Sequence, residues 1–301
     1  MSGAILAQES PVVFEASLSD FLDVRLLVKR DDLLPFPLAG NKVRKLTAEF
    51  ASVGTMPELV ITNGAVNSNH CRTLAIMAAR AGVAAHCVLH GDAESASSQL
   101  SLTMLRSLGC TFEVVEPSQI AIAIDRARLR AEDDGAAVRV IAGGCHTPAG
   151  ARAYLDIGLA EFSAHQPDVV VVASGTGATQ GGLAAAAARS LSSPRVIGVS
   201  VARDVERGIA PVREAAAWAG APEASIEFLD GYRDGGYGRW TQATQSSLDL
   251  AWKHGLLVDH TYTAKAFAAL VDRVTIGDIP RGSTVLFWHT GGLWNYLAAE
   301  L

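Results

Sequence analysis

The chain has 301 residues, of which 49% are hydrophobic and 19% are charged, and its formal net charge is -6 at pH 7. This length and apolar content predict a globular protein of about two domains. The negative charge and the lack of a long basic run argue against a nucleic-acid partner, because phosphate backbones attract clustered Lys and Arg. No apolar run reaches the roughly 18 residues that a membrane-spanning helix needs, so no membrane association is expected.

The cysteines predict a reducing environment. Cys71, Cys87, Cys110 and Cys145 show no C-x-x-C spacing, and each lies in or beside an apolar segment. Such cysteines are typical of reduced core thiols. We therefore expect a cytoplasmic protein and predict no metal site.

Short β-rich runs alternate with longer helical runs along the chain. The expected strands cover residues 24–28, 59–62, 84–89, 111–115, 138–141, 168–173 and 195–201, and the expected helices cover residues 41–53, 68–81, 95–108, 120–132, 148–162 and 183–190. The run 168–173 is almost wholly β-branched, as in parallel strands that are covered on both faces. The alternation predicts an α/β fold of open, twisted, mostly parallel sheets flanked by helices, with ligands at the carboxyl ends of the strands.

Lys42 is the first candidate for chemistry. It lies in the stretch Leu38-Ala-Gly-Asn-Lys-Val-Arg-Lys45, behind a flexible Gly40 and beside a polar Asn41. A lysine in a closed, partly desolvated site has a lowered pKa and can form a Schiff base with a carbonyl. The alternative is that Lys42, Arg44 and Lys45 form a solvated basic face at a helix start, which is the preferred interpretation for a lone lysine.

A glycine-rich loop over residues 173–183 is the second candidate. It leaves the core strand and enters a helix, so that backbone N–H groups and the helix dipole converge on one point, as in anion sites. Gly175 and Gly177 allow close backbone approach, while Thr176 and Thr179 can add hydroxyl donors. The open alternatives are a tight βα turn that uses glycine without binding any ligand and a nucleotide site. Against a nucleotide site, no acidic residue follows about 20 positions on and no Walker lysine is present.

The third candidate, residues 62–72, also follows a buried strand and begins a helix. Ser68, Asn69 and His70 present hydroxyl, amide and backbone N–H donors at the positive end of that helix, where a substrate carboxylate would be stabilised. The alternative is a helix cap followed by a surface histidine, which explains Ser68 and Asn69 without chemistry.

Together these stretches resemble the pyridoxal-phosphate enzymes of the D-cysteine desulfhydrase and 1-aminocyclopropane-1-carboxylate deaminase family, within the tryptophan-synthase-β-like fold (fold type II). The resemblance covers nearly the whole chain in the right order. It is carried by Lys29-Arg-Asp-Asp32, Gly40-Asn-Lys-Val-Arg-Lys45, Ser68-Asn-His70, Gly143-Gly144, residues 175–182, Tyr237-Gly238, Tyr262-Thr-Ala-Lys265 and His289-Thr-Gly-Gly292.

The resemblance implies a cofactor, pyridoxal 5'-phosphate, and a role for each matching residue. Lys42 is then the Schiff-base lysine, and the loop Gly175, Thr176, Gly177, Ala178 and Thr179 holds the phosphate, while Asn69 contacts the ring hydroxyl and Thr290 lies near the pyridine nitrogen. Ser68 and the neighbouring N–H groups of Asn69 and His70 bind the substrate carboxylate, and Tyr237 and Tyr262 line the catalytic face. For each tyrosine, a packed core aromatic is the alternative.

The resemblance also implies two domains and a homodimer. The smaller domain covers about residues 47–153 and is inserted into a larger cofactor domain of residues 1–46 and 154–301, with the site in the cleft between them. The implied activity is that of a lyase or deaminase acting on a small β-substituted amino acid.

Two positions favour β-elimination over ring opening. Ring-opening deaminases of the family carry a glutamate after the catalytic-face tyrosine and a leucine before the late glycine pair, whereas this chain has Thr263 and Thr290. A threonine gives the ring nitrogen no charged partner, which suffices for elimination of a good leaving group. Ring opening, β-replacement and racemisation remain alternatives within the class, and a nicotinamide-dependent oxidoreductase or a non-catalytic binding protein remains outside it.

Several residues depart from the family pattern: Ala39, Ala65, Asn67, His260, Ala264 and the segment Cys145-His-Thr147. Added methyl groups predict a narrower cleft. His146 is either a new acid, base or carboxylate partner or, as the preferred interpretation, a solvated loop histidine. The departures suggest a substrate that has drifted from D-cysteine.

Overall fold

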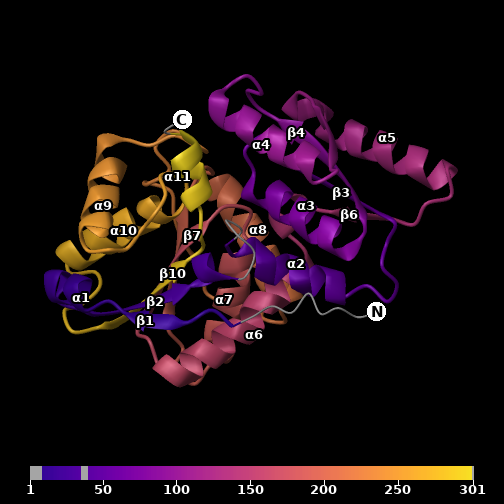
Figure 1. Ribbon diagram of the computed structural model, residues 1–301. Coiled ribbons are helices and arrows are strands. Elements are labelled where there is room, and N and C mark those ends of the chain that lie inside the picture. The colour runs from indigo at the N-terminus through magenta and orange to yellow at the C-terminus, as the bar shows by residue number, and fades with distance from the viewer. Residues whose placement is uncertain (1–8, 35–39, 300–301) are drawn as a thin grey trace.

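The computed structural model describes residues 9–34 and 40–299, and two twisted sheets surrounded by helices make up this part of the chain (Figure 1). The first sheet has the strand order β1-β2-β10-β7-β8-β9. Its strands are β1 Val12–Phe14, β2 Arg25–Arg30, β7 Val169–Ser174, β8 Arg195–Ser200, β9 Glu227–Leu229 and β10 Thr284–His289. Only the β1–β2 pair is antiparallel.

The second sheet is wholly parallel and has the order β5-β4-β3-β6. Its strands are β3 Leu59–Ala65, β4 Ala84–His90, β5 Thr111–Val114 and β6 Val138–Ile141. The predicted fold class is therefore confirmed, and each strand expected from the sequence is present.

The helices follow the alternation that the sequence predicts. They are α1 Ala16–Leu22, α2 Lys42–Ala51, α3 Asn69–Ala81, α4 Ala96–Ser107, α5 Ile120–Asp133, α6 Pro148–His165, α7 Ala178–Arg189, α8 Val205–Trp218, α9 Gln242–Lys253, α10 Thr263–Thr275 and α11 Leu293–Ala299, with the short 3₁₀ turns η1 Asp31–Leu33, η2 Pro117–Gln119 and η3 Gly143–Cys145.

Strand β7 shows why the first sheet is buried on both faces. Val169 and Val171 pack into a core with α1, α9 and α10, while Val170 and Val172 pack into a second core with α6 and α7. Alternate side chains of a strand point to opposite faces, so an unbroken β-branched run is what two covered faces require.

Helix α7 begins earlier than the sequence suggests. It starts at Ala178 rather than at Leu183, because Gly177 ends the turn with a φ of 102°. Gly181 and Gly182 therefore lie inside the helix rather than in a loop. A Cβ atom on Gly182 would lie 2.3 Å from the Ala151 carbonyl oxygen, so these glycines allow α7 to pack closely on its neighbours.

The second sheet has its own core, which includes Val43, Leu46 and Phe50 of α2. All strands of the second sheet lie within residues 47–153, and all strands of the first lie outside that range. The domain boundaries themselves stay a prediction. All four cysteines are buried and free. Across residues 9–34 and 40–299, no helix combines the length and the apolar character needed to cross a bilayer.

Candidate active site between the two sheets

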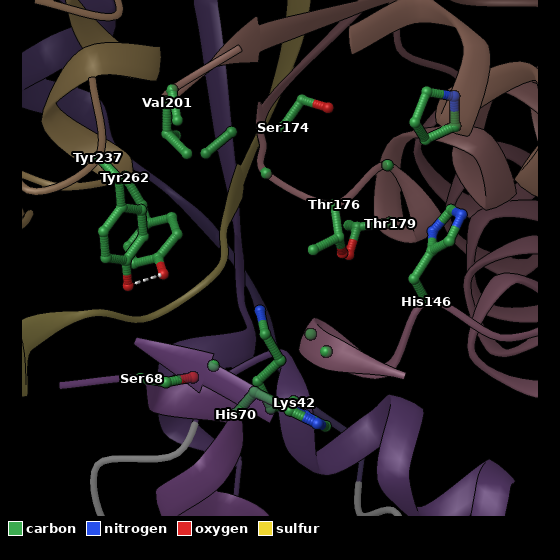
Figure 2. A pocket seen from close by; sticks show the side chains of 18 of the residues that line it. Lys42, Ser68, His70, His146, Ser174, Thr176, Thr179, Val201, Tyr237 and Tyr262 are labelled. Carbon is green, nitrogen blue, oxygen red and sulfur yellow. Dashed lines mark hydrogen bonds between the residues drawn. The ribbon is translucent and has the colours of Figure 1, made fainter. Parts of the chain in front are cut away.

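A cavity of about 600 Å³ lies between the two sheets (Figure 2). Its lining includes Ala65 at the end of β3, Ala142 after β6, Ser174 at the end of β7 and Val201 after β8. The carboxyl ends of strands from both sheets thus converge on one cavity, which is where parallel α/β sheets place their ligands.

Lys42 is the first residue of α2 and lines this cavity. Its Nζ atom donates a hydrogen bond to Asn41 Oδ1 at 2.7 Å and lies 5.9 Å from the centre of the Tyr262 ring. Burial, and then the positive charge of Lys45, lower the pKa of Lys42 well below its ordinary value. A larger share of this amine is therefore neutral, and a neutral amine is the form that attacks a carbonyl or accepts a proton.

A buried carboxylate anchors the start of α2. Asp31 accepts hydrogen bonds from Arg44 Nη2 (2.8 Å), the Tyr154 hydroxyl (2.7 Å) and Trp288 Nε1 (2.8 Å). Burial alone would raise the pKa of Asp31, but the charge of Arg44 and these donors outweigh it and hold the pKa below its ordinary value. Asp31 thereby joins η1, α2, α6 and β10. Its partner on α2 is Arg44, two residues after Lys42.

The interpretation of Lys42, Arg44 and Lys45 as a solvated basic face is wrong. Lys45 is only 2% exposed, lines the cavity, and donates from Nζ to the Gly144 carbonyl oxygen at 2.6 Å. Burial lowers its pKa to about 8. The signal was present in the sequence, because residues three apart on a helix share a face, so Lys45 follows Lys42 into the cavity.

The turn into α7 forms an anion cradle at one side of the cavity. Gly175, Thr176, Gly177 and Thr179 line it. The first N–H groups of a helix have no partner within the helix. In α7 the N-cap residue Gly177 provides no side chain to pair with them. Ala178 is not among the lining residues.

Ser174 supplies a separate indication that a polar group belongs in this cradle. Ser174 lines the same cavity, and its Oγ atom is buried and has no hydrogen-bond partner among the described residues. Buried hydroxyls are normally paired, and an anion at the cradle would supply the missing partner. Lys45, which also lines the cavity, has the charge that such an anion requires.

Ser68 caps α3 and faces the cavity. Its Oγ atom accepts a hydrogen bond from the Cys71 N–H at 3.4 Å, which leaves its own proton free to be donated. His70 lines the cavity and is 1% exposed, so the interpretation as a surface histidine is wrong. Asn69 is not among the lining residues, and its Oδ1 atom accepts a hydrogen bond from Arg72.

Tyr237 and Tyr262 face each other on the far wall, and their hydroxyl oxygens lie 2.6 Å apart (Figure 2). Both line the cavity; Tyr262 also packs against the core of the first sheet, whereas Tyr237 is 37% exposed and is not a core aromatic. Burial, and then Tyr237, raise the pKa of Tyr262 well above its ordinary value, so the pair holds its protons at neutral pH.

Two residues with no role predicted from the sequence, Asp259 and Lys265, hold these tyrosines in place. The Tyr262 backbone N–H donates to Asp259 Oδ2 at 3.1 Å. Lys265 Nζ donates to the carbonyl oxygens of Arg233 (2.8 Å) and Gly236 (3.1 Å), which fixes the loop that carries Tyr237. The Lys265 contacts join segments that are close only in the folded chain, whereas Asp259 lies three residues before Tyr262.

Of the two threonines used to separate elimination from ring opening, only Thr290 lines the cavity. Its carbonyl oxygen accepts the Asn41 N–H at 3.0 Å, which places it beside Lys42. Thr263 is fully buried, and its hydroxyl donates to Asp259 Oδ1 at 2.8 Å at the start of α10.

The departures from the family pattern divide in the same way. Ala65 and His146 line the cavity, whereas Asn67, His260 and Ala264 do not, and Ala39 lies outside the described residues. His146 is not a solvated loop histidine, because its Nε2 atom lies 3.1 Å from Glu214 Oε2 and its ring packs on Trp218 with centroids 4.9 Å apart.

A two-sheet α/β fold whose central cavity joins a lysine of lowered pKa to a helix-end anion cradle is the arrangement of an enzyme with a phosphorylated carbonyl cofactor. The sequence matches the pyridoxal-phosphate-dependent enzymes over residues 6–291, so the chain belongs to that family. The predicted cofactor and enzyme class are confirmed, and the nicotinamide and non-catalytic alternatives fall away.

The relatives agree with the resemblance seen in the sequence. A D-cysteine desulfhydrase of Klebsiella pneumoniae is 32% identical, over 96% of this chain and 93% of its own length. A D-cysteine desulfhydrase of Salmonella newport is 31% identical over the same shares. A crystal structure of a 1-aminocyclopropane-1-carboxylate deaminase homologue superposes with a TM-score of 0.84 at 27% identity, over 97% of this chain and 91% of that one.

Proposed function

We propose that this protein is a lyase that uses pyridoxal phosphate to release a β-substituent from a small amino acid, as the D-cysteine desulfhydrases among its relatives do. The observation that carries the proposal is the position of Lys42, whose amine has a lowered pKa and lies in one cavity with the cradle of α7 and the paired tyrosines. These are the groups that attachment of the cofactor, proton removal and release of a leaving group require.

The residues present fit the cofactor. Lys42 would hold it covalently, and the N–H groups of residues 177–179, with the hydroxyls of Ser174 and Thr179, would hold its phosphate. When bound, pyridoxal phosphate supplies a carbonyl that condenses with amines and a conjugated ring that stores an electron pair left at Cα.

The chain's own groups then supply binding and proton transfer. The Ser68 hydroxyl and the N–H groups at the start of α3 bind the substrate carboxylate. Lys42, as a neutral amine in this cavity, is the base that would take the α-proton of the substrate. As the bond from Cβ to the leaving sulfur breaks, the Tyr237–Tyr262 pair donates a proton to that sulfur.

The charges of the cavity favour elimination over ring opening. Among its described lining residues the only carboxylate is Glu214, which pairs with His146. Thr290, which the family resemblance puts near the pyridine nitrogen, offers no negative charge there. The assignments of Asn69 to the ring hydroxyl and of Thr290 to the ring nitrogen stay proposals.

We also propose a cytoplasmic homodimer. The support is the resemblance to a family whose members usually form homodimers, together with four cysteines that are buried and free. Light scattering after size-exclusion chromatography measures the oligomeric state directly, and a monomer would contradict this part of the proposal.

The test is the visible absorption spectrum of the purified protein before and after addition of D-cysteine, with pyruvate and sulfide assayed in the same cuvette. Parallel runs with L-cysteine and with 1-aminocyclopropane-1-carboxylate separate the hand of the substrate from the reaction. Turnover of D-cysteine establishes the desulfhydrase. A coloured protein that releases neither product rejects this substrate while leaving the family unchanged.

Lys42→Ala is the matched variant for the covalent role. It should bind the cofactor without covalent attachment, so that borohydride reduction leaves no label at residue 42, while circular dichroism remains that of the wild type. A reduced label elsewhere in an otherwise active Lys42→Ala protein would sink the central claim.

A further inference from the structure

His146 joins the two sides of the cavity. It follows η3, whose Gly144 lies against the α7 turn: a Cβ atom on Gly144 would lie 2.7 Å from Thr176 Cγ2. From this position the ring reaches α8, where Nε2 lies 3.1 Å from Glu214 Oε2 and the ring packs on Trp218. Figure 2 shows the His146 ring on the side of the cavity where Thr176 and Thr179 lie.

Glu214 itself is held next to the cradle. A Cβ atom on Gly177 would lie 3.0 Å from the backbone of Pro211, so α8 abuts the start of α7. Glu214 follows Pro211 by three residues and shares its face of the helix. Both Glu214 and His146 line the cavity.

The two ring nitrogens of His146 have different surroundings. A carboxylate oxygen can only accept a hydrogen bond, so the contact with Glu214 requires a proton on Nε2. Nδ1 is buried and has no partner among the described residues. In a neutral ring with Nε2 protonated, Nδ1 carries a lone pair, and only the imidazolium can donate from both nitrogens.

We propose that His146 is a further ligand of the cofactor's phosphate, acting as an imidazolium whose Nε2–H is held by Glu214 and whose Nδ1–H is donated to a phosphate oxygen. The proposal rests on the placement of the phosphate in the loop from Gly175 to Thr179. Binding of the phosphate then takes up one proton from solvent at Nδ1, and Glu214 acts as the positioning residue.

The charges around the ring determine when this proton is present. Without the cofactor, burial lowers the pKa of His146, and Lys45 and Arg203 act in the same direction, against the contact with Glu214. On α6, Arg152 bonds the Trp218 carbonyl oxygen (3.4 Å) and adds a further positive charge to this region. A phosphate dianion at the cradle reverses the balance, because it stabilises the cationic ring.

The test compares the wild type with His146→Phe, which keeps a ring against Trp218 but removes both nitrogens. Dialysis of each holoenzyme against graded pyridoxal phosphate gives the dissociation constant across pH. At about pH 6 the wild type should bind pyridoxal phosphate about tenfold more tightly than His146→Phe does, because of the imidazolium contact. This difference in affinity should disappear towards about pH 9, where the ring is neutral. Phosphorus-31 NMR of the wild-type holoenzyme should show a titration step that His146→Phe lacks.

Two further variants separate the explanations. Glu214→Gln should move the loss of the contact to lower pH, because the carboxylate no longer stabilises the imidazolium. Thr179→Val tests the placement of the phosphate itself. If Thr179→Val weakens binding while His146→Phe matches the wild type at every pH, the role of His146 is overturned and the cradle stands. If neither variant changes binding, the cradle placement fails as well.

Discussion

Thr62 fixes the protonation of His70. The Thr62 hydroxyl donates to the Ile141 carbonyl oxygen at 2.6 Å, and the Thr62 hydroxyl oxygen itself lies 2.8 Å from His70 Nε2. Since the hydroxyl proton is already used, Nε2 must carry the proton of this second hydrogen bond. His70 Nδ1, which has no partner among the described residues, is left as an acceptor.

We predict that His70 stays neutral, with Nε2 protonated, across the range in which exposed histidines titrate. Burial, and then the charges of Lys42 and Lys45, lower its pKa well below the ordinary value. Nitrogen-15 NMR of labelled histidine reports the tautomer and charge directly. A His70 signal that titrates near about pH 6.5, or one protonated at Nδ1, would contradict the prediction.

The same shift has a consequence for stability. The pKa of His70 is about 6.5 in the unfolded chain and lower in the folded protein. Below about pH 6.5 the unfolded chain therefore binds more protons than the folded protein does. The free energy of unfolding should therefore fall as the pH falls below about 6.5, by up to about 1.4 kcal/mol per pH unit for one such group. Urea unfolding at several pH values measures this dependence. The free energy of unfolding of His70→Gln should change less steeply with pH than that of the wild type, and an equal slope for the two proteins would assign the acid sensitivity to other groups.

Gly40→Ala should weaken the fold where it holds Lys42. Gly40 has a φ of +59°, and a Cβ atom there would lie 2.3 Å from the Thr290 carbonyl oxygen, which is also the acceptor of the Asn41 N–H. Gly82→Ala is a matched control, because Gly82 has a similar φ of +69° but open space around its Cβ position. We expect Gly40→Ala to cost about 1–3 kcal/mol more than the control and to lower cofactor occupancy. Equal costs would mean that only backbone strain matters.

The sheets could be predicted from the sequence because their signals are local. The β-branched run of β7 and the alternation of strands and helices need no tertiary information. Lys42 and the cradle were found for the same reason, since each follows a strand and begins a helix. Helix α7 was placed too late because its internal glycines look like turn residues until the packing against α6 and α8 is known.

What the sequence did not reveal depends on contacts between distant segments. Lys265 holds the loop of Tyr237 through carbonyl oxygens about 30 residues away in the chain, and no local pattern marks such a contact. Thr263 was used to separate elimination from ring opening because it follows Tyr262, but the start of α10 turns it towards Asp259. Because α10 begins at Thr263, directly after Tyr262, the two neighbouring side chains point in different directions.

Arg72→Lys should loosen the contact between α3 and α11. Arg72 is 3% exposed, and it donates to the Asn67 carbonyl oxygen (2.7 Å) and to Asn295 Oδ1 (3.0 Å) as well as to Asn69. A lysine cannot reproduce the planar fork, so we expect a loss of about 2–4 kcal/mol in urea unfolding and faster hydrogen exchange in α11. Arg106→Lys is the exposed control and should change stability by less than about 0.5 kcal/mol. Matching effects of the two variants would contradict the role of Arg72.

Lys45 presents a conflict between stability and binding. Burial lowers its pKa to about 8 in the folded protein, against an ordinary value near 10.5. At neutral pH the folded chain therefore keeps a charge in a site that disfavours it, and the Lys45 ammonium donates its hydrogen bond to the neutral Gly144 carbonyl oxygen. A phosphate at the cradle would provide the countercharge that this lysine lacks.

We therefore predict that Lys45→Met stabilises the cofactor-free protein near neutral pH, by on the order of 1–3 kcal/mol, and weakens the binding of pyridoxal phosphate. The unfolded chain holds more protons than the folded one between about pH 8 and 10.5, so wild-type stability rises with pH in that window and the advantage of Lys45→Met shrinks. Urea unfolding at several pH values, paired with cofactor dissociation constants, measures both effects. If Lys45→Met is less stable than the wild type at every pH, Lys45 is kept for its packing and its hydrogen bond to Gly144. If stability rises but binding is unchanged, the buried charge does not serve the phosphate.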